Sequence, residues 1–193
     1  SIYTTHGKRF LDIFLVLLAA PVLLPLIGII LGLTAAFGGR PLYSQLRVGR
    51  NGETFRCWKV RTMIPDADQA LSLILRDNPL LAQEWRQNQK LARDPRVTCF
   101  GAVLRKTSLD ELPQLWNVLV GEMSLVGPRP FLPEQQAQYD SRLCGTSYYL
   151  MRPGITGLWQ VGRRNRASFG ERAVFDADYA GRISLVTDLM ILC

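Results

Sequence analysis

Two neighbouring carboxylates, Asp110 and Glu111, are the residues whose types and spacing most directly suggest chemistry. They lie in the stretch TSLDELPQLW, residues 107–116. A carboxylate can act as a nucleophile and form a covalent intermediate, and a second one can bind a metal ion or position a substrate. Adjacent helical residues point about 100° apart. The pair therefore suits one nucleophile and one metal-binding or positioning group better than two acids that share a proton.

The same residues can instead stabilise the start of a helix. Ser108 and Glu111 have the spacing of a capping box, and Asp110 would complement the helix dipole. Each such feature contributes about 1 kcal/mol. Pro113 favours a start at Asp110, because a proline at the third helical position lies where its missing N–H group would be free anyway. From these residues alone, catalysis and capping are equally supported.

The composition excludes several catalytic classes. The only histidine is His6, close to the N-terminus, so a Ser-His-Asp triad or an HExxH zinc site cannot form in the body of the chain. The four cysteines lie far apart without a CxxC pair, which argues against a zinc site and a disulfide framework and favours free thiols. The net charge of +7 and the pI of about 9.6 indicate an anionic partner, such as nucleic acid, anionic lipid or a phosphorylated substrate.

Basic residues recur beside prolines, glycines and expected strand ends, where the direction of the backbone is fixed. They are Lys59, Arg61, Arg105, Lys106, Arg129, Arg152, Arg163 and Arg164. Arginine in such settings suits bidentate contact with phosphate. A basic surface facing solvent or anionic lipid would explain several of these residues, but it explains Arg129, held rigidly in GPRP, less well.

Residues 13–37 form an apolar segment of about 25 residues without a charge. As a helix it would be about 37 Å long, compared with about 30 Å of bilayer hydrocarbon, so we expect it to enter the membrane. Basic residues lie at both ends of this segment. Because basic flanks prefer the cytoplasmic side, the two ends disagree about which of them is cytoplasmic. They are Lys8, Arg9, Arg40, Arg47 and Arg50.

Prolines near the middle of this segment suggest how both basic flanks can lie on one side. Each proline removes a helix donor and crowds the preceding turn. We therefore favour a re-entrant helix, broken at Ala20, Pro21 and Pro25, over a kinked helix that crosses the membrane once.

The rest of the sequence predicts one helix-rich, mixed α+β unit. We expect residues 1–39 to form the membrane helix and its flanks, and residues 40–193 to form a catalytic domain continuous with it. Asn51-Gly52 predicts a hairpin, and Pro79 divides residues 66–92 into two helices. Further expected elements are a helix ending at Arg105-Lys106, an extended loop in LVGPRPFLP and a C-terminal helix in GERAVFDADYAGRISLVTDLMIL. Because the chain begins at Ser1 and stops in an apolar run, we also expect it to be part of a longer protein, truncated at the C-terminus.

The sequence resembles the bacterial sugar transferase family, the monotopic phosphoglycosyl transferases. The resemblance runs from about Lys8 to the C-terminus, through KRFLDI, KVRTM, LRKTSLDELPQLWNVLVGEMSLVGPRP, RPGITGLWQV and FDADY. It implies that an Asp carboxylate attacks the sugar-bearing phosphate of a UDP-sugar, that UMP leaves, and that membrane polyprenyl (undecaprenyl) phosphate then takes the sugar phosphate. It also implies a Mg²⁺ cofactor and a catalytic domain on the cytoplasmic face of the bacterial inner membrane.

The resemblance assigns roles to individual residues. Asp110 is at the position of the nucleophile, and it and Glu111 are expected to bind Mg²⁺. Arg105 and Arg129 match arginines that contact phosphate, and Asp176 matches a later acidic residue. With the basic residues described above, the expected substrate contacts are Lys59, Arg61, Arg105, Arg129, Arg152 and Asp176. The family often has Ser-Pro at the helix break, where this chain has Ala20-Pro21.

The expected partners are a UDP-sugar, polyprenyl phosphate and membrane lipid, and a homodimer is left open. The insertion NPLLAQEW resembles hexose-type members of exopolysaccharide or O-antigen pathways, so we expect galactose or glucose. One alternative is a non-catalytic, membrane-anchored basic scaffold that binds anionic lipid or nucleic acid. The sequence has no stacking-aromatic motif or basic helix of the kind that binds nucleic acid. The other alternative is an enzyme of the same chemistry with a single membrane-spanning helix.

Overall fold

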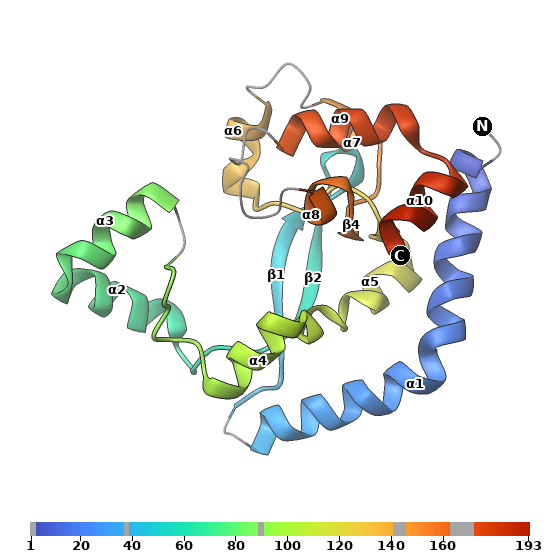
Figure 1. The fold of residues 1–193 in the computed structure, drawn as a ribbon. Helices are drawn as coiled ribbons and strands as arrows, with labels where there is room; N and C mark the ends of the chain where they lie inside the picture. Colours follow the sequence, from blue (N-terminus) through green and yellow to red (C-terminus); the bar gives the residue numbers. More distant parts are fainter. Residues whose placement is uncertain (1–2, 37–38, 89–90, 141–145, 163–171) are drawn as a thin grey trace.

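The structure is a computed structural model that describes residues 3–36, 39–88, 91–140, 146–162 and 172–193. Helices surround two small sheets, which confirms the predicted helix-rich α+β class (Figure 1). In chain order the elements are η1 (Tyr3–Gly7), α1 (Lys8–Ala36), β1 (Leu42–Val48), η2 (Arg50–Gly52), β2 (Thr54–Val60), α2 (Ala67–Asp77), α3 (Pro79–Asn88), α4 (Cys99–Thr107), η3 (Leu109–Glu111), α5 (Gln114–Val120), β3 (Ser124–Val126), η4 (Pro133–Gln135), α6 (Gln136–Asp140), α7 (Thr146–Tyr149), β4 (Gly154–Thr156), α8 (Leu158–Gly162), α9 (Arg172–Arg182) and α10 (Leu185–Leu192).

The predicted hairpin is present as the antiparallel pair β1–β2, which runs from Leu42 opposite Val60 to Val48 opposite Thr54. Its turn contains Asn51 at φ 58° and Gly52 at φ 80°, a conformation that these two residue types adopt readily. Alternation along β2 places one row of side chains in the core, where Phe55 packs with residues of α1 and α5.

The second sheet was not predicted. Strands β3 and β4 run parallel and pair Ser124 with Gly154 and Val126 with Thr156. Gly127 and Gly154 permit this close approach. A Cβ on Gly127, for example, would lie 2.4 Å from the carbonyl oxygen of Arg152. Strands of three residues carry too little alternation to be recognised in a sequence, and β3 occupies the start of the segment that was expected to be loop.

The helices agree with the sequence in the α2–α3 region and differ from it at the C-terminus. As predicted, α2 ends before Pro79, which opens α3 at a position where its missing N–H group is tolerated. These two helices form an arm that projects from the rest of the chain (Figure 1). The expected single C-terminal helix is instead two helices, because the hydroxyl of Ser184 caps a new start by accepting from Thr187 N at 3.1 Å.

Helix α1 is continuous from Lys8 to Ala36 across both of its prolines, and its course bends part-way along (Figure 1). It is long and apolar enough to cross a membrane. Most of its apolar surface faces away from the protein; Leu18 and Val22 are 66% and 72% exposed. This exposed apolar helix indicates association with a membrane. Helix α1 ends at Ala36, shortly before the boundary that we expected between residues 39 and 40. The division of the chain into a membrane segment and a catalytic domain at that boundary remains a prediction.

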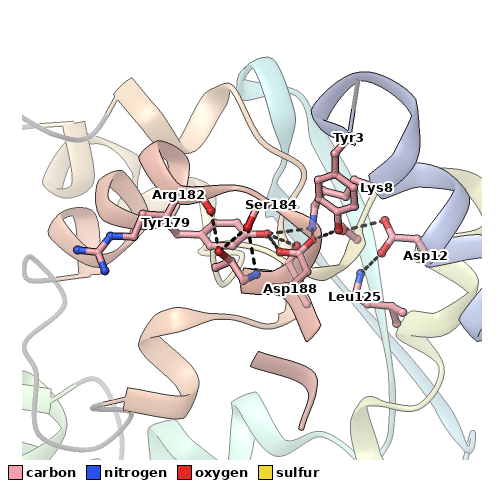
Figure 2. Close-up of polar contacts among 11 residues, drawn as sticks. Tyr3, Lys8, Asp12, Leu125, Tyr179, Arg182, Ser184 and Asp188 are labelled. Carbon is pink, nitrogen blue, oxygen red and sulfur yellow. Dashed lines mark hydrogen bonds and ion pairs between the residues drawn. The ribbon is translucent and has the colours of Figure 1, made fainter. Parts of the chain in front are cut away.

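A buried polar cluster attaches the N-terminal end of α1 to the C-terminal helices (Figure 2). The Lys8 ammonium donates to Asp188 Oδ2 at 2.5 Å and to the Tyr179 hydroxyl at 2.9 Å. Tyr3 donates to the same Asp188 oxygen at 2.5 Å, and Tyr179 donates to Asp188 Oδ1 at 2.5 Å. Lys8 is therefore paired with protein groups, and does not serve only as a flanking charge for lipid.

Two further charged residues of α1, Arg9 directly after Lys8 and Asp12 one turn along, contact the centre of the protein. The buried Asp12 accepts hydrogen bonds from Ser124 Oγ at 2.8 Å and from Leu125 N at 2.9 Å, which ties α1 to β3 (Figure 2). Arg9 donates to the carbonyl oxygen of Leu119 at 2.7 Å, near the C-terminus of α5. Cations at this end of a helix are favourable because its last carbonyl groups are otherwise unpaired.

We expect Asp12→Ala to lower the free energy of unfolding by about 1–3 kcal/mol, because it leaves the Leu125 N–H group without its partner in the interior. The matched control is Asp178→Ala, whose carboxylate pairs with Arg182 on the surface and is 38% exposed. The control should change stability by about 0.5 kcal/mol or less. The measurement is denaturant unfolding of both variants in the same detergent, and equal effects would contradict an anchoring role for Asp12.

Candidate active site

A cavity of about 770 Å³ lies where the β1–β2 hairpin, the α2–α3 arm and the acidic pair meet. Its size falls in the range typical of small-molecule sites. Six of the predicted site residues line it: Lys59, Arg61, Arg105, Asp110, Glu111 and Arg129. The structure therefore brings together residues from four separate segments of the sequence.

The acidic pair does not begin a helix in either of the two ways that the sequence suggested. Ser108 has a left-handed backbone, φ 58°, and ends α4 without capping through its side chain. The acids then lie in the short 3₁₀ turn η3, and α5 begins only at Gln114, with Pro113 in the preceding position. Pro113 still lies where its missing donor is not needed, but Asp110 is not the cap. The carboxylates are free for other partners because the helix does not use them.

Glu111 is held by two cations. Its Oε1 atom accepts from Lys59 Nζ at 2.8 Å and from Arg129 Nη2 at 2.7 Å. Burial alone would raise the pKa of Glu111, but the two cations outweigh it and lower the pKa to about 2. Glu111 is therefore a fixed, ionised carboxylate that joins β2, η3 and the GPRP segment.

Asp110 has the opposite environment. It is largely buried, and its carboxylate has no hydrogen bond to another residue in the part of the chain that the structure describes. Burial raises its pKa, the charge of Lys59 opposes that rise, and the charge of Glu111 adds to it. Two adjacent carboxylates whose pKa values are pushed apart are suited to different tasks. Asp110 is the more basic group and the one available to react.

The cations of the cavity are set in place by the backbone and by neutral side chains. Arg105 Nε donates to the hydroxyl of Thr62 at 2.8 Å, which directs its guanidinium group toward the cavity that both residues line. The Arg61 backbone N–H group donates to the Pro41 carbonyl oxygen at 2.8 Å. Arg47, which the sequence analysis did not assign to the site, also lines the cavity. Its place in an alternating strand gave no signal that distinguished it from a surface residue.

The backbone of Arg129 is held by a hydrogen bond from α9. The guanidinium group of Arg172 donates to the Arg129 carbonyl oxygen at 2.7 Å. Asp176, one turn further along α9, is buried and accepts a hydrogen bond from the hydroxyl of Tyr139. Burial raises the pKa of Asp176 to about 6, although that hydrogen bond and the charge of Arg172 oppose the shift. The structure therefore places Asp176 behind the site, not at the cavity.

Arg152 also lies away from the cavity. Its Nε atom donates to the Gly121 carbonyl oxygen at 2.8 Å, at the C-terminal end of α5. The sequence analysis missed Asn117 instead, which is fully buried. The Asn117 amide accepts from Trp58 N at 3.1 Å and donates to Arg56 O at 2.8 Å. These bonds hold β2 against α5, and hence hold Lys59 near Glu111.

The residues at the cavity fit a Mg²⁺ ion that is shared with substrate. Among the described residues no group of three or more His, Cys, Asp or Glu side chains could hold a metal ion by itself. Mg²⁺, however, usually binds one or two carboxylates and completes its shell with water and substrate phosphates. Asp110 and Glu111 supply that number of carboxylates in one cavity.

Comparison with known proteins shows the family of the chain. The family described as "Bacterial sugar transferase" matches residues 3–193. The chain belongs to the bacterial sugar transferase family. This sugar transferase is thus a phosphoglycosyl transferase, and the alternative of a non-catalytic scaffold is not supported.

The sugar transferase is similar to relatives of different lengths. It is 46% identical over 188 residues to "Exopolysaccharide production protein ExoY" of Sinorhizobium fredii, covering 96% of this chain and 82% of that protein. It is 44% identical to "UDP-galactose-lipid carrier transferase" of Erwinia amylovora, covering 97% and 40% of the two chains. It is 46% identical to "Undecaprenyl-phosphate galactose phosphotransferase" of Salmonella typhimurium, covering 80% and 32%. The chain therefore spans less than half of the two longer relatives.

The ion pairs of Glu111 predict how the stability of the sugar transferase depends on pH. A glutamate in the unfolded chain takes up its proton near pH 4.5, whereas folded Glu111 stays ionised down to pH of about 2. The stability that this group contributes is complete above pH 4.5 and is lost as the pH falls toward 2. We expect the wild-type protein to lose about 3 kcal/mol more than Glu111→Gln between pH 5 and pH 2. Denaturant unfolding at each pH measures this difference, and the same pH dependence in both proteins would contradict it.

Proposed function

We propose that the sugar transferase moves a hexose 1-phosphate from a UDP-hexose to membrane polyprenyl phosphate through a covalent intermediate on Asp110. The observation that carries the proposal is the contrast within the acidic pair. Glu111 is ionised and bound by Lys59 and Arg129, while Asp110 is buried, has no cation bound to it among the described residues and faces the same cavity. One carboxylate is fixed in position, and the other is available to attack.

In the first step a carboxylate oxygen of Asp110 attacks the phosphorus that bears the hexose. The bond from this phosphorus to the oxygen bridging the two phosphates breaks, and UMP leaves with that electron pair. The nearby cations, among them Arg105 and Arg129, reduce the repulsion between an anionic nucleophile and an anionic diphosphate. Dividing the transfer in this way replaces one difficult displacement with two easier ones.

In the second step an oxygen of the acceptor's phosphate attacks the same phosphorus. The bond to the Asp110 oxygen breaks, the carboxylate is regenerated, and the product is a polyprenyl diphosphate hexose. No electrons are exchanged with another reactant, and an ionised acceptor needs no proton removed. Glu111 keeps Lys59 and Arg129 in place through both steps, because the ion pair does not depend on either substrate.

Asp110 and Glu111 would hold the Mg²⁺ ion, which would neutralise charge on the diphosphate of the donor. Galactose is our first choice of hexose, because the names of two relatives state it, and glucose is the second. The name of a third relative refers to exopolysaccharide production, so we place the reaction at the start of surface polysaccharide assembly.

Replacing the nucleophile should abolish the first step. We expect Asp110→Asn to lower the rate of UMP release from UDP-galactose by at least about 1,000-fold, because an amide cannot attack phosphorus as a carboxylate does. The control is Asp77→Asn, an exposed carboxylate that pairs with its neighbour Arg76 on the surface. Release of UMP is measured with Mg²⁺ and undecaprenyl phosphate present. Asp110→Asn with wild-type release would exclude Asp110 as nucleophile.

We further propose that α1 is re-entrant and that the catalytic domain lies on the cytoplasmic face. A straight helix of 29 residues would separate its ends by about 43 Å. Both ends of α1 instead contact the same protein body: Lys8 pairs with Asp188, and Ile30 packs with Val60 of β2. The bend in α1 agrees with this arrangement (Figure 1), and prolines are the usual cause of such bends. This kind of attachment would keep an aqueous active site beside a lipid acceptor.

The topology can be tested with single cysteines at Thr4 and at Arg40, placed in a background without the native cysteines. We expect an impermeant maleimide to label neither position in intact spheroplasts and both in inverted vesicles, because the ends of α1 lie on the cytoplasmic side. A cysteine on an established periplasmic loop of another protein controls for intact membranes. Labelling of position 4, but not position 40, in spheroplasts would favour a single-spanning helix.

A further inference from the structure

A second cavity, of about 350 Å³, adjoins the first. Glu111 and Arg129 line both cavities, so the ion pair forms a shared wall. The lining differs, however. The larger cavity is rich in charged groups, whereas the residues that line the smaller one include the apolar Leu112, Leu115 and Ile155. The two substrates of the proposed reaction differ in the same way. One is a charged nucleotide sugar, and the other is a phosphate on an apolar chain.

The apolar side of the second cavity is continuous with the contacts of the membrane helix. Leu115 packs against the core cluster that contains Val16 of α1, and Leu112 packs against the cluster that contains Ile30 of α1. The same two leucines line the cavity. An apolar chain that reaches this cavity from the bilayer would therefore remain close to α1.

A buried amide marks the polar side. Gln160 of α8 lines the cavity, and its side-chain nitrogen and oxygen are both buried without a hydrogen-bond partner in the part of the chain that the structure describes. A buried amide that lacks partners is costly, and such groups in native proteins call for an explanation. A ligand group that enters beside Gln160 would supply the missing partner.

We propose that the second cavity binds the polyprenyl phosphate acceptor, with its phosphate near Arg129 and Gln160 and its first isoprene units against Leu112, Leu115 and Ile155. The inference rests on the proposed function and adds to it a separate subsite for the second substrate. Lys59 and Arg129 share one carboxylate, so this group of three carries a net positive charge that suits a phosphate.

Val161 provides a test that should not disturb the fold. It lines the second cavity but not the first, and it is 56% exposed. The matched control is Val174 of α9, which is 60% exposed and lines neither cavity. We compare Val161→Asp with Val174→Asp, because a carboxylate should repel both the phosphate and the apolar chain only where the acceptor binds. Gln160→Leu, which removes the amide and keeps the volume similar, is the second test.

The two steps of the reaction are measured separately on the full chain in lipid nanodiscs. The burst of UMP released from UDP-galactose or UDP-glucose without acceptor reports the first step. Initial rates at varied undecaprenyl phosphate report the second. For Val161→Asp and Gln160→Leu we expect a burst within about threefold of wild type and a KM for the acceptor raised at least about tenfold. We expect Val174→Asp to match wild type in both.

Each other outcome has a definite meaning. Equal losses in the burst and in acceptor turnover would assign the cavity to the sugar of the donor and overturn the proposal. An unchanged KM for the acceptor in both variants would also overturn it. Loss of the folded state in Val161→Asp, seen as a lowered unfolding midpoint, leaves Gln160→Leu to decide. A wild-type chain that gives no burst with either UDP-hexose would contradict the two-step function itself, which is a different failure.

Discussion

The sharing of one Glu111 oxygen by Lys59 and Arg129 is the interaction on which the site depends. It joins three segments that are distant in the sequence: the last part of β2, the 3₁₀ turn after α4 and the proline-rich segment after β3. Because the group is largely buried, removing one partner leaves an uncompensated charge, which is strongly destabilising. The same contact keeps cations at the cavity wall and leaves Asp110 as the member of the acidic pair that has no partner among the described residues.

The attachment of α1 to the rest of the protein also depends on a few polar contacts between distant segments. Its N-terminal end is fixed by buried polar contacts, through Lys8 to Asp188 and through Asp12 to β3, while its C-terminal half packs by apolar contacts around Ile30. Polar contacts specify direction and register, whereas apolar packing tolerates adjustment. The helix that carries the apolar surface is thereby held next to the strands and turns that form the active site. Under the proposed function, a lipid acceptor would not have to leave the membrane to reach it.

Local signals predicted much of this molecule, and long-range contacts account for what was missed. Asn51-Gly52 predicted the hairpin and Pro79 the division of α2 from α3, because each signal acts within a few residues. The acidic pair was identified, but its setting was not, since the left-handed turn at Ser108 is not apparent from residue types. The β3–β4 pair and the position of Asp176 behind Arg129 depend on contacts between distant segments, which no local pattern contains.

The central claim is that Asp110 becomes covalently bound to the hexose phosphate. The most direct test is to incubate the chain with UDP-galactose and Mg²⁺ without an acceptor, quench it, and map the modification by peptide mass spectrometry. We expect one hexose phosphate per chain, located at Asp110 in the peptide that contains residues 107–116, and we expect it to disappear when undecaprenyl phosphate is added before the quench. Release of UMP without any adduct, or an adduct on a different residue, would contradict it.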